Sequence, residues 1–151
     1  MSLETRLVGP DAAADVLPVV RAAFAARPVL DPPADALRET EETIAVTLAG
    51  GGGLVTYDDG KPVAAVVLDP VGDALYLRRF GVDPAAQGHG IARALVRAGL
   101  RQASQRGLRR VVILARDELP RTVRFWRDMG FVQTGHHPPY LEMERPVPAL
   151  V

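Results

Sequence analysis

The chain has 151 residues, of which 48% are hydrophobic and 24% are charged, and its formal net charge is zero. This length and composition predict one globular domain over residues 1–151, and the balanced charge favours neither nucleic acid nor a membrane surface as a partner. The sequence contains no cysteine, which excludes disulfides, thiolate metal sites and a cysteinyl acyl-enzyme. Without a signal peptide or an apolar run near about 18 residues, we expect a cytoplasmic protein.

The first third of the chain predicts a strand and two helices. Residues 5–8 form a short strand candidate, and Asp11 is expected to cap a helix whose apolar side chains recur at helical spacing. Prolines make residues 27–34 a stiff loop, and a second helix is expected from about residue 35 to 49. The glycine run 50–53 follows this helix and leads into a strand. We therefore interpret it as a helix end, because a phosphate loop has the opposite order.

The middle of the chain predicts an antiparallel meander. Two apolar runs, 54–57 and 62–68, are joined through Asp-Gly, which is typical of a hairpin. A further turn leads to a strand at 75–82, which is followed by a glycine-rich turn and a helix at about 90–106. A strand at 111–115 completes a right-handed crossover, so it should lie parallel to 75–82.

The last part of the chain predicts a helix from Leu119 to Met129 and an antiparallel pair, 131–134 and 140–145. A loop over 135–139, which contains His136 and His137, should join these strands. The element order is β α α β β β α β α β β. It predicts an α+β fold with a mixed central sheet of about six to seven strands.

The stretch 87–92, Gln-Gly-His-Gly-Ile-Ala, carries the strongest chemical signal. It runs from a strand into a helix, and the first amides of a helix have no internal partner and lie at the positive end of its dipole. Glycines at 88 and 90 leave these donors accessible to a bulky anion. The pattern predicts a site for a diphosphate, with a purely structural turn as the alternative.

Two common phosphate loops fit this stretch poorly. A dinucleotide-binding fingerprint would require a third glycine at position 93, where the chain has Arg93. A P-loop would require Gly-Lys-Ser or Gly-Lys-Thr, which is absent from the sequence.

The motif Gln87-x-x-Gly90-x-Ala92 resembles the signature of the GCN5-related N-acetyltransferases (GNAT). It is preceded by Val-Asp-Pro at 82–84, as is common in that family. The segment 125–131, Phe-Trp-Arg-Asp-Met-Gly-Phe, resembles the family's second landmark, an aromatic pair followed by Gly-Phe. The two motifs lie about 40 residues apart, each on the element that the family requires, and the order of elements agrees along the whole chain.

The resemblance implies acyl transfer from acetyl-CoA to an amine. Strand 75–82 would splay from strand 111–115, leaving Phe80 to Val82 to bind the pantetheine arm like an added strand. The backbone N–H near Phe80 would donate to the thioester oxygen. The residues implied to bind the cofactor are Phe80, Gly81, Val82, Gln87, Gly88, His89, Gly90, Ile91, Ala92, Arg93 and Trp126.

The catalytic groups are less defined. Many members of the family carry a tyrosine and an asparagine where this chain has Trp126 and Leu119. An indole N–H is not an acid at neutral pH, so Trp126 is interpreted as a packing residue beside the thioester. The candidate bases are Asp117, Glu118, Glu142, His136 and His137.

We expect the acceptor to lie under the loops at 27–34 and 135–139, with contacts from Arg78, Trp126, His137 and Tyr140. Arg78 is two residues from Phe80 and should share its strand face, where a guanidinium can hold a substrate carboxylate, with an exposed ion pair as the alternative. No metal-ligand spacing is evident.

The resulting hypothesis is direct transfer of an acetyl group to a primary amine of a small molecule, because no cysteine is available for a ping-pong route. The alternatives are a non-catalytic acyl-CoA-binding or regulatory module and a protein amine acetyltransferase. A homodimer is possible in such folds.

Overall fold

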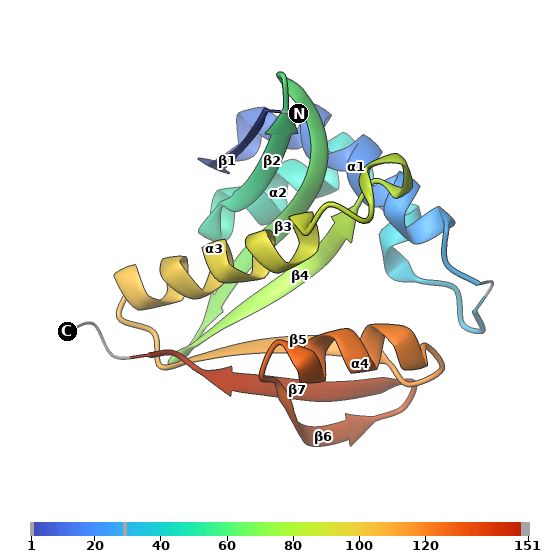
Figure 1. Cartoon of the computed structure of the whole chain (residues 1–151), viewed down its shortest axis with the longest axis vertical. Helices are drawn as coiled ribbons and strands as arrows, with labels where there is room; N and C mark the ends of the chain where they lie inside the picture. The colour runs from blue at the N-terminus through green and yellow to red at the C-terminus, as the bar shows by residue number, and fades with distance from the viewer. Residues whose placement is uncertain (1, 29, 149–151) are drawn as a thin grey trace.

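One mixed sheet of seven strands organises the described part of the chain, in the order β1-β2-β3-β4-β5-β7-β6 (Figure 1). The computed structural model describes residues 2–28 and 30–148. The strands are β1 (Leu3–Val8), β2 (Gly53–Asp58), β3 (Lys61–Val71), β4 (Ala74–Val82), β5 (Arg110–Arg116), β6 (Val132–His137) and β7 (Tyr140–Pro146). The α-helices are α1 (Ala13–Ala25), α2 (Glu41–Gly51), α3 (Ile91–Gln105) and α4 (Pro120–Asp128). The 3-10 turns are η1 (Pro10–Ala12), η2 (Asp35–Arg38) and η3 (Pro84–Ala86), and the predicted α+β class and element order are confirmed.

The strands β4 and β5 are the only parallel neighbours in the described sheet, and they pair over a short stretch. Their pairing runs from Ala74 to Tyr76 on β4 and from Arg110 to Val112 on β5, and then stops. Figure 1 shows the two strands diverging beyond this point, with β5, β7 and β6 moving away from the rest of the sheet. The predicted splay is therefore confirmed.

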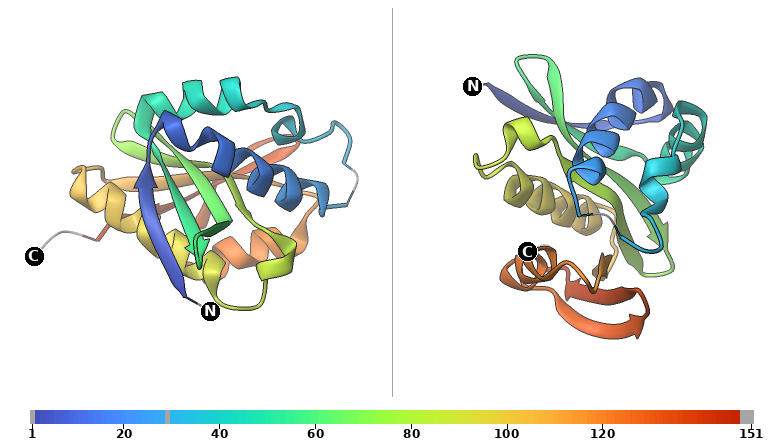
Figure 2. Two further views of the ribbon diagram at one scale, coloured as in Figure 1. Left: turned by 90° about the horizontal axis from the view of Figure 1, so that it is seen from above. Right: turned by 90° about the vertical axis from the view of Figure 1, so that its right-hand side faces the viewer.

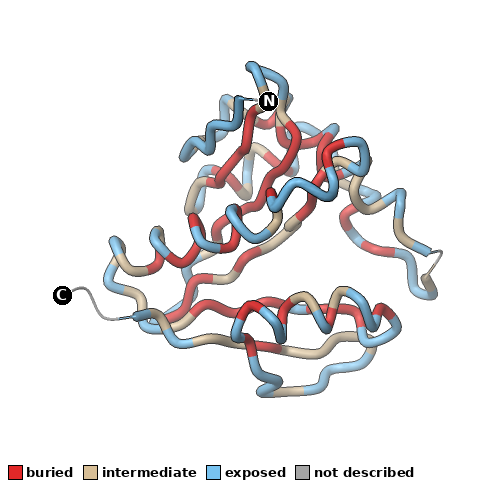
Figure 3. The backbone as a smooth tube through the Cα atoms, in the orientation of Figure 1, coloured by how far each residue is buried: buried red, intermediate tan, exposed pale blue. Residues whose placement is uncertain are grey.

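Two apolar cores cover the two faces of the sheet. Along β3, Ala64, Val66 and Leu68 belong to one core and Ala65 and Val67 to the other, as the alternation of a strand requires. The first core contains side chains of α3 and α4, and the second contains those of α1 and α2. Figure 2 shows these helix pairs on opposite sides of the sheet, and Figure 3 shows burial concentrated in the central strands. A sheet covered on both faces explains why the central strands are continuously apolar.

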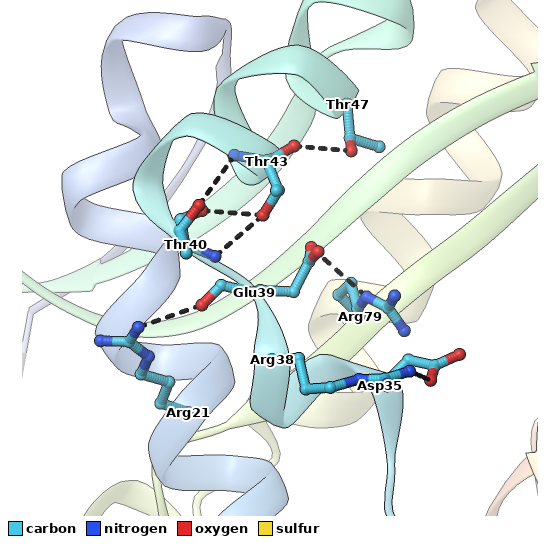
Figure 4. Close-up of polar contacts among 8 residues, drawn as sticks. All are labelled: Arg21, Asp35, Arg38, Glu39, Thr40, Thr43, Thr47 and Arg79. Carbon is cyan, nitrogen blue, oxygen red and sulfur yellow. Dashed lines mark hydrogen bonds and ion pairs between the residues drawn. The ribbon is translucent and has the colours of Figure 1, made fainter.

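The helix starts in the first part of the chain differ from expectation. Asp11 does not cap α1, because it lies inside η1, and α1 begins at Ala13 without a side-chain cap. The helix expected at 35–49 is divided into η2 and α2. The division falls at Thr40, which is extended and is the N-cap of α2. The Thr40 hydroxyl accepts from the Thr43 N–H at 3.2 Å, and the Thr43 hydroxyl accepts from the Thr40 N–H at 2.8 Å (Figure 4). This reciprocal cap fixes the helix start.

The glycine run at 50–53 and the loop expected at 135–139 can also be compared with the structure. Within the glycine run, α2 ends at Gly51, Gly52 has a φ of 77°, and β2 starts at Gly53, so the interpretation as a helix end is confirmed. The expected loop at 135–139 is wrong, because β6 continues through His137, which pairs with Tyr140. None of the helices in the described ranges is both long enough and apolar enough to cross a membrane.

Candidate active site

The glycine-rich stretch between β4 and α3 has the geometry of an anion-binding turn. Gly88 has a φ of 90° and Gly90 a φ of 73°, a left-handed backbone that strains any residue with a side chain. Gly90 is the N-cap of α3 and makes no side-chain hydrogen bond, so no side-chain cap occupies the first amides of the helix. A Cβ placed on either glycine would meet nothing within 4 Å, so the space beside both residues is open. The turn can therefore accept a ligand anion.

A β-bulge distorts β4 beside this turn. The pairing with β3 shifts opposite Val66, so that two residues of β4, Arg79 and Phe80, face this single residue. Arg79 has a φ of 54°, which identifies it as the irregular position. Leu77 and Phe80 consequently pack on the same core, that of α3 and α4. The bulge therefore aims the Phe80 side chain across the splay.

The bulge also overturns one prediction. Arg78 and Phe80 were expected on the same face, but the extra residue places Arg78 on the face opposite Leu77 and Phe80. Arg78 Nε donates to Asp69 Oδ2 at 2.6 Å, and its guanidinium lies 4.6 Å from the centre of the Tyr76 ring. Arg78 is therefore half of an ion pair on that face.

The irregular residue Arg79 is held from the other side of the sheet. Its Nε lies 3.5 Å from a carboxylate oxygen of Glu39, at the junction of η2 and α2 (Figure 4). The backbone oxygen of Glu39 accepts from Arg21 of α1 at 3.0 Å. This chain of contacts links the bulge to both N-terminal helices.

An aromatic cluster faces the bulge. The Trp126 ring lies 5.0 Å from the Phe80 ring, 5.1 Å from Phe125 and 5.0 Å from Phe131, each in an edge-to-face arrangement. Trp126 is 5% exposed and also lines the cavity. Such packing agrees with the interpretation of Trp126 as a wall residue. Gly130, with a φ of 89°, ends α4 and allows Phe131 to enter the core.

The buried Arg116 is a feature that sequence reasoning missed. Its guanidinium donates to both carboxylate oxygens of Glu118, at 3.1 and 2.8 Å, and to the carbonyl of Pro32 at 2.7 Å. The hydrogen bond from Arg116 is the main cause that holds the pKa of Glu118 at about 2, well below its ordinary value. Glu118 is thus the anchor of an arginine that ties β5 to the 27–34 loop, and it is too weak a base to accept a proton from an amine. Position 29 of that loop lies outside the described residues.

A cavity of about 720 Å³ passes through the splay and is lined from both faces of the sheet. Its size is in the range of small-molecule sites. The predicted cofactor residues in its lining are Phe80, Gly81, Val82, Gln87, Gly88, Gly90, Ile91, Ala92, Arg93 and Trp126, whereas His89 is not among the described lining residues. Of the predicted acceptor contacts, Arg78, Trp126 and Tyr140 line the cavity and His137 does not. Arg27, Asp35, Tyr76 and Arg116 line it without having been singled out as acceptor contacts in the sequence.

The predicted bases lie elsewhere. His136 Nε2 and Asp117 Oδ2 form a solvent-exposed pair at 2.9 Å, and Glu142 accepts a hydrogen bond from the Thr134 hydroxyl at 3.0 Å. None of these side chains is among the described residues that line the cavity. Their roles as bases stay predictions. In the described ranges, no three histidine or acidic side chains gather as metal ligands would.

Comparison with known proteins agrees with this geometry. The sequence profile of the acetyltransferase (GNAT) family matches residues 20–131. The chain therefore belongs to the GNAT family, whose enzymes are acyltransferases that use acetyl-CoA.

Among curated relatives, the chain is 42% identical over 53 residues to a mycothiol acetyltransferase of Amycolatopsis mediterranei, a match covering 35% of the chain and 18% of the relative. A mycothiol acetyltransferase of Saccharomonospora viridis is 40% identical over 62 residues, which cover 41% of the chain and 19% of that protein. These matches span less than a fifth of the length of either relative.

Solved structures share the fold over nearly the whole chain. The PaiA N-acetyltransferase of Thermoplasma acidophilum, solved in complex with coenzyme A, has a TM-score of 0.84 at 15% identity, covering 97% of this chain and 99% of that one. The ribosomal-protein-S18-alanine N-acetyltransferase of Escherichia coli has a TM-score of 0.80 at 17% identity, covering 99% and 96% of the two chains. The fold is that of the GNAT family.

Proposed function

We propose that this protein transfers the acetyl group of acetyl-CoA directly to the primary amine of a small molecule. The observation that carries the proposal is the single cavity through the splay. It brings an uncapped helix start, a bulged strand and an aromatic wall together with polar side chains from the loop after α1, from β5 and from β7. The family supplies the class of reaction, and the cavity supplies a place for both substrates.

The donor would lie along one side of this cavity. The amides from Gly88 to Ala92, together with Gln87, would hold the pyrophosphate of the cofactor. Beyond Tyr76 the edge of β4 that faces β5 has no strand partner, so its backbone groups from Phe80 to Val82 can bind the pantetheine arm. The thioester would then reach Phe80, whose N–H would stabilise the tetrahedral oxygen, with Trp126 as the wall behind it.

The transfer requires a neutral amine. Its nitrogen attacks the thioester carbonyl carbon, a C–N bond forms, and the C–S bond breaks with the electron pair leaving on the thiolate. The proton that the amine loses passes to solvent in our scheme, because Asp35 is the only carboxylate among the described lining residues and it pairs with Arg38. The rate should therefore rise with pH as the amine itself deprotonates.

A second candidate, a non-catalytic acyl-CoA-binding module, is favoured by two observations. Trp126 takes the place of the family's tyrosine, and no predicted base is found in the described lining. Against a protein acceptor, the curated relatives are named mycothiol acetyltransferases, which supports a small-molecule amine.

The test is to follow thiol release from acetyl-CoA with a panel of small amines and of peptides that have a free amine. Mass spectrometry should show the N-acetyl product. Turnover with small amines supports the proposal, and turnover with peptides alone would replace it with protein acetylation. Acetyl-CoA binding without turnover of any member favours the binding module.

A further inference from the structure

Four arginines line the acceptor side of the cavity, which is formed by α1, the 27–34 loop, β4 and the end of β5. Three of them have a carboxylate partner. Arg78 pairs with Asp69 at 2.6 Å, Arg79 with Glu39 at 3.5 Å, and Arg116 with Glu118 at 2.8 Å. Arg27, the fourth, forms no ion pair with any residue in the described ranges. Arg27 is therefore the unpaired arginine on this side. Two further arginines of the cavity lining, Arg93 of α3 and Arg121 of α4, also form no ion pair within the described ranges.

Arg27 is held in a defined position. Its guanidinium carbon lies 4.0 Å from the centre of the Phe24 ring. The same ring lies 3.8 Å from the place of a Cβ on Gly81, the residue after Phe80. The Phe24 ring thus lies between the Arg27 guanidinium and the strand segment where the thioester is proposed to bind.

The surroundings of Arg27 disfavour its charge. Burial lowers the pKa of the guanidinium, and the neighbouring Arg116 lowers the same pKa further. An arginine nevertheless remains protonated in proteins, so the unfavourable energy persists until an anion arrives. Asp35, the only carboxylate in the described lining, does not supply that anion because it pairs with Arg38.

We propose that Arg27 binds an acidic group, of carboxylate or phosphate geometry, on the acceptor, which is therefore an amine that also carries an acid. The inference rests on the proposed function and names the substrate class for the same cavity. A planar guanidinium stacked on an aromatic ring offers two parallel donors to such a group. It also repels an ammonium, so the acid end of the acceptor is drawn toward Arg27 and the amine end is left to face the thioester.

The first test compares α- and ω-amino acids and amino phosphates with the corresponding neutral amides and alcohols as acceptors. The wild type should prefer the acids, and Arg27→Met should raise their KM by about tenfold or more, as expected for a lost charge-assisted hydrogen bond. The neutral acceptors should change less than about twofold, within the usual effect of a surface substitution. Arg101→Met, an exposed arginine of α3 outside the cavity lining, is the matched control. Equal losses for acids and neutral amines, or no preference in the wild type, would overturn the inference.

The second test needs no turnover. With coenzyme A at saturation, so that the turn at Gly88 and Gly90 is occupied, the melting temperature is measured in sodium phosphate and in sodium chloride of equal ionic strength. Phosphate should stabilise the wild type and the Arg101→Met control beyond the general stabilisation that this salt gives folded proteins, and Arg27→Met should lose the additional part. An equal phosphate response in Arg27→Met would refute the anion site. An Arg27-dependent response in a protein that acetylates no amine would instead contradict the proposed transfer and leave the anion site standing.

Discussion

The two sides of the cavity are built in different ways. The donor side comes from one continuous stretch, the end of β4 and the turn at 87–92, and it offers mainly backbone amides fixed by two glycines. The acceptor side gathers side chains from separated parts of the chain, among them Arg27 after α1, Arg116 at the end of β5 and Tyr140 at the start of β7. A site made from backbone geometry is local in sequence, whereas a site made from side chains depends on how distant elements pack. We therefore propose that the donor side is general to the family and that the acceptor side is where this chain selects its substrate.

The largest effect is expected from a substitution that disrupts only the donor side, at the turn 87–92. Gly90→Glu places a side chain on a backbone with a φ of 73° and puts a negative charge where the pyrophosphate would bind. We expect the loss of detectable acetyl-CoA binding in calorimetric titration. Gly50→Glu is the control, since Gly50 is exposed in α2 and a Cβ there meets nothing within 4 Å. Retained binding by Gly90→Glu would contradict the donor assignment.

A second substitution tests how closely α1 packs against β4, where the two sides of the cavity meet. A Cβ on Gly81 would lie 2.6 Å from the Cβ of Ala23 on α1, and neither atom can rotate away. Gly81→Ala should therefore push α1 from β4 and lower the free energy of unfolding by about 1–3 kcal/mol, measured by urea denaturation. Gly9→Ala serves as the control, because its φ is −116° and a Cβ there meets nothing within 4 Å. Equal stability of the two variants would show that α1 does not pack this closely.

The role of Trp126 can be separated into packing and chemistry. If Trp126 only packs beside the thioester, Trp126→Phe should change kcat by less than about tenfold. Removal of a general acid would instead lower kcat by about 10²–10⁴-fold. The same variant should lower stability, because it leaves a void among Phe80, Phe125 and Phe131. A hundredfold loss of kcat in a folded variant would make the indole a participant in the reaction.

The smallest expected effect is the pH dependence that comes from Glu118. Its pKa in the folded protein is about 2 and its ordinary value is 4.5, so its ion pair with Arg116 stabilises the fold fully above pH 4.5. This contribution is lost as the pH falls from 4.5 toward 2. Glu118→Gln should flatten the unfolding free energy in that window, and Asp59→Asn, in an exposed turn, should not. Identical acid profiles for Glu118→Gln and the wild type would show that the pair is not formed in solution.

The sequence predicted those features that rest on local rules. The helix end at Gly51, the hairpin through Asp-Gly, and the strand, turn and helix around Gly90 each follow from the φ preference of glycine or from apolar periodicity. The splay followed from the family resemblance and is confirmed by the short pairing of β4 with β5.

The features that were missed depend on tertiary contacts. The bulge at Arg79 has no glycine to mark it, and it is held by Glu39 from a distant connection. Because of this one extra residue, the alternation rule placed Arg78 on the wrong face. The burial of Arg116 likewise depends on Pro32, which comes from another part of the chain. An arginine after an apolar strand is too common a pattern to predict such a contact.

Binding of acetyl-CoA in the cavity through the splay can be measured by the melting temperature of the wild type with and without acetyl-CoA. At a hundredfold excess over Kd, a ligand that binds only the folded state stabilises it by about 2.7 kcal/mol. For a chain of this size, each kcal/mol shifts the melting temperature by about 2–4 °C. We predict an increase of about 5–11 °C in the wild type, by the same two relations, and none in Gly90→Glu. An unchanged melting temperature of the wild type at millimolar acetyl-CoA would show that the cavity does not bind this cofactor.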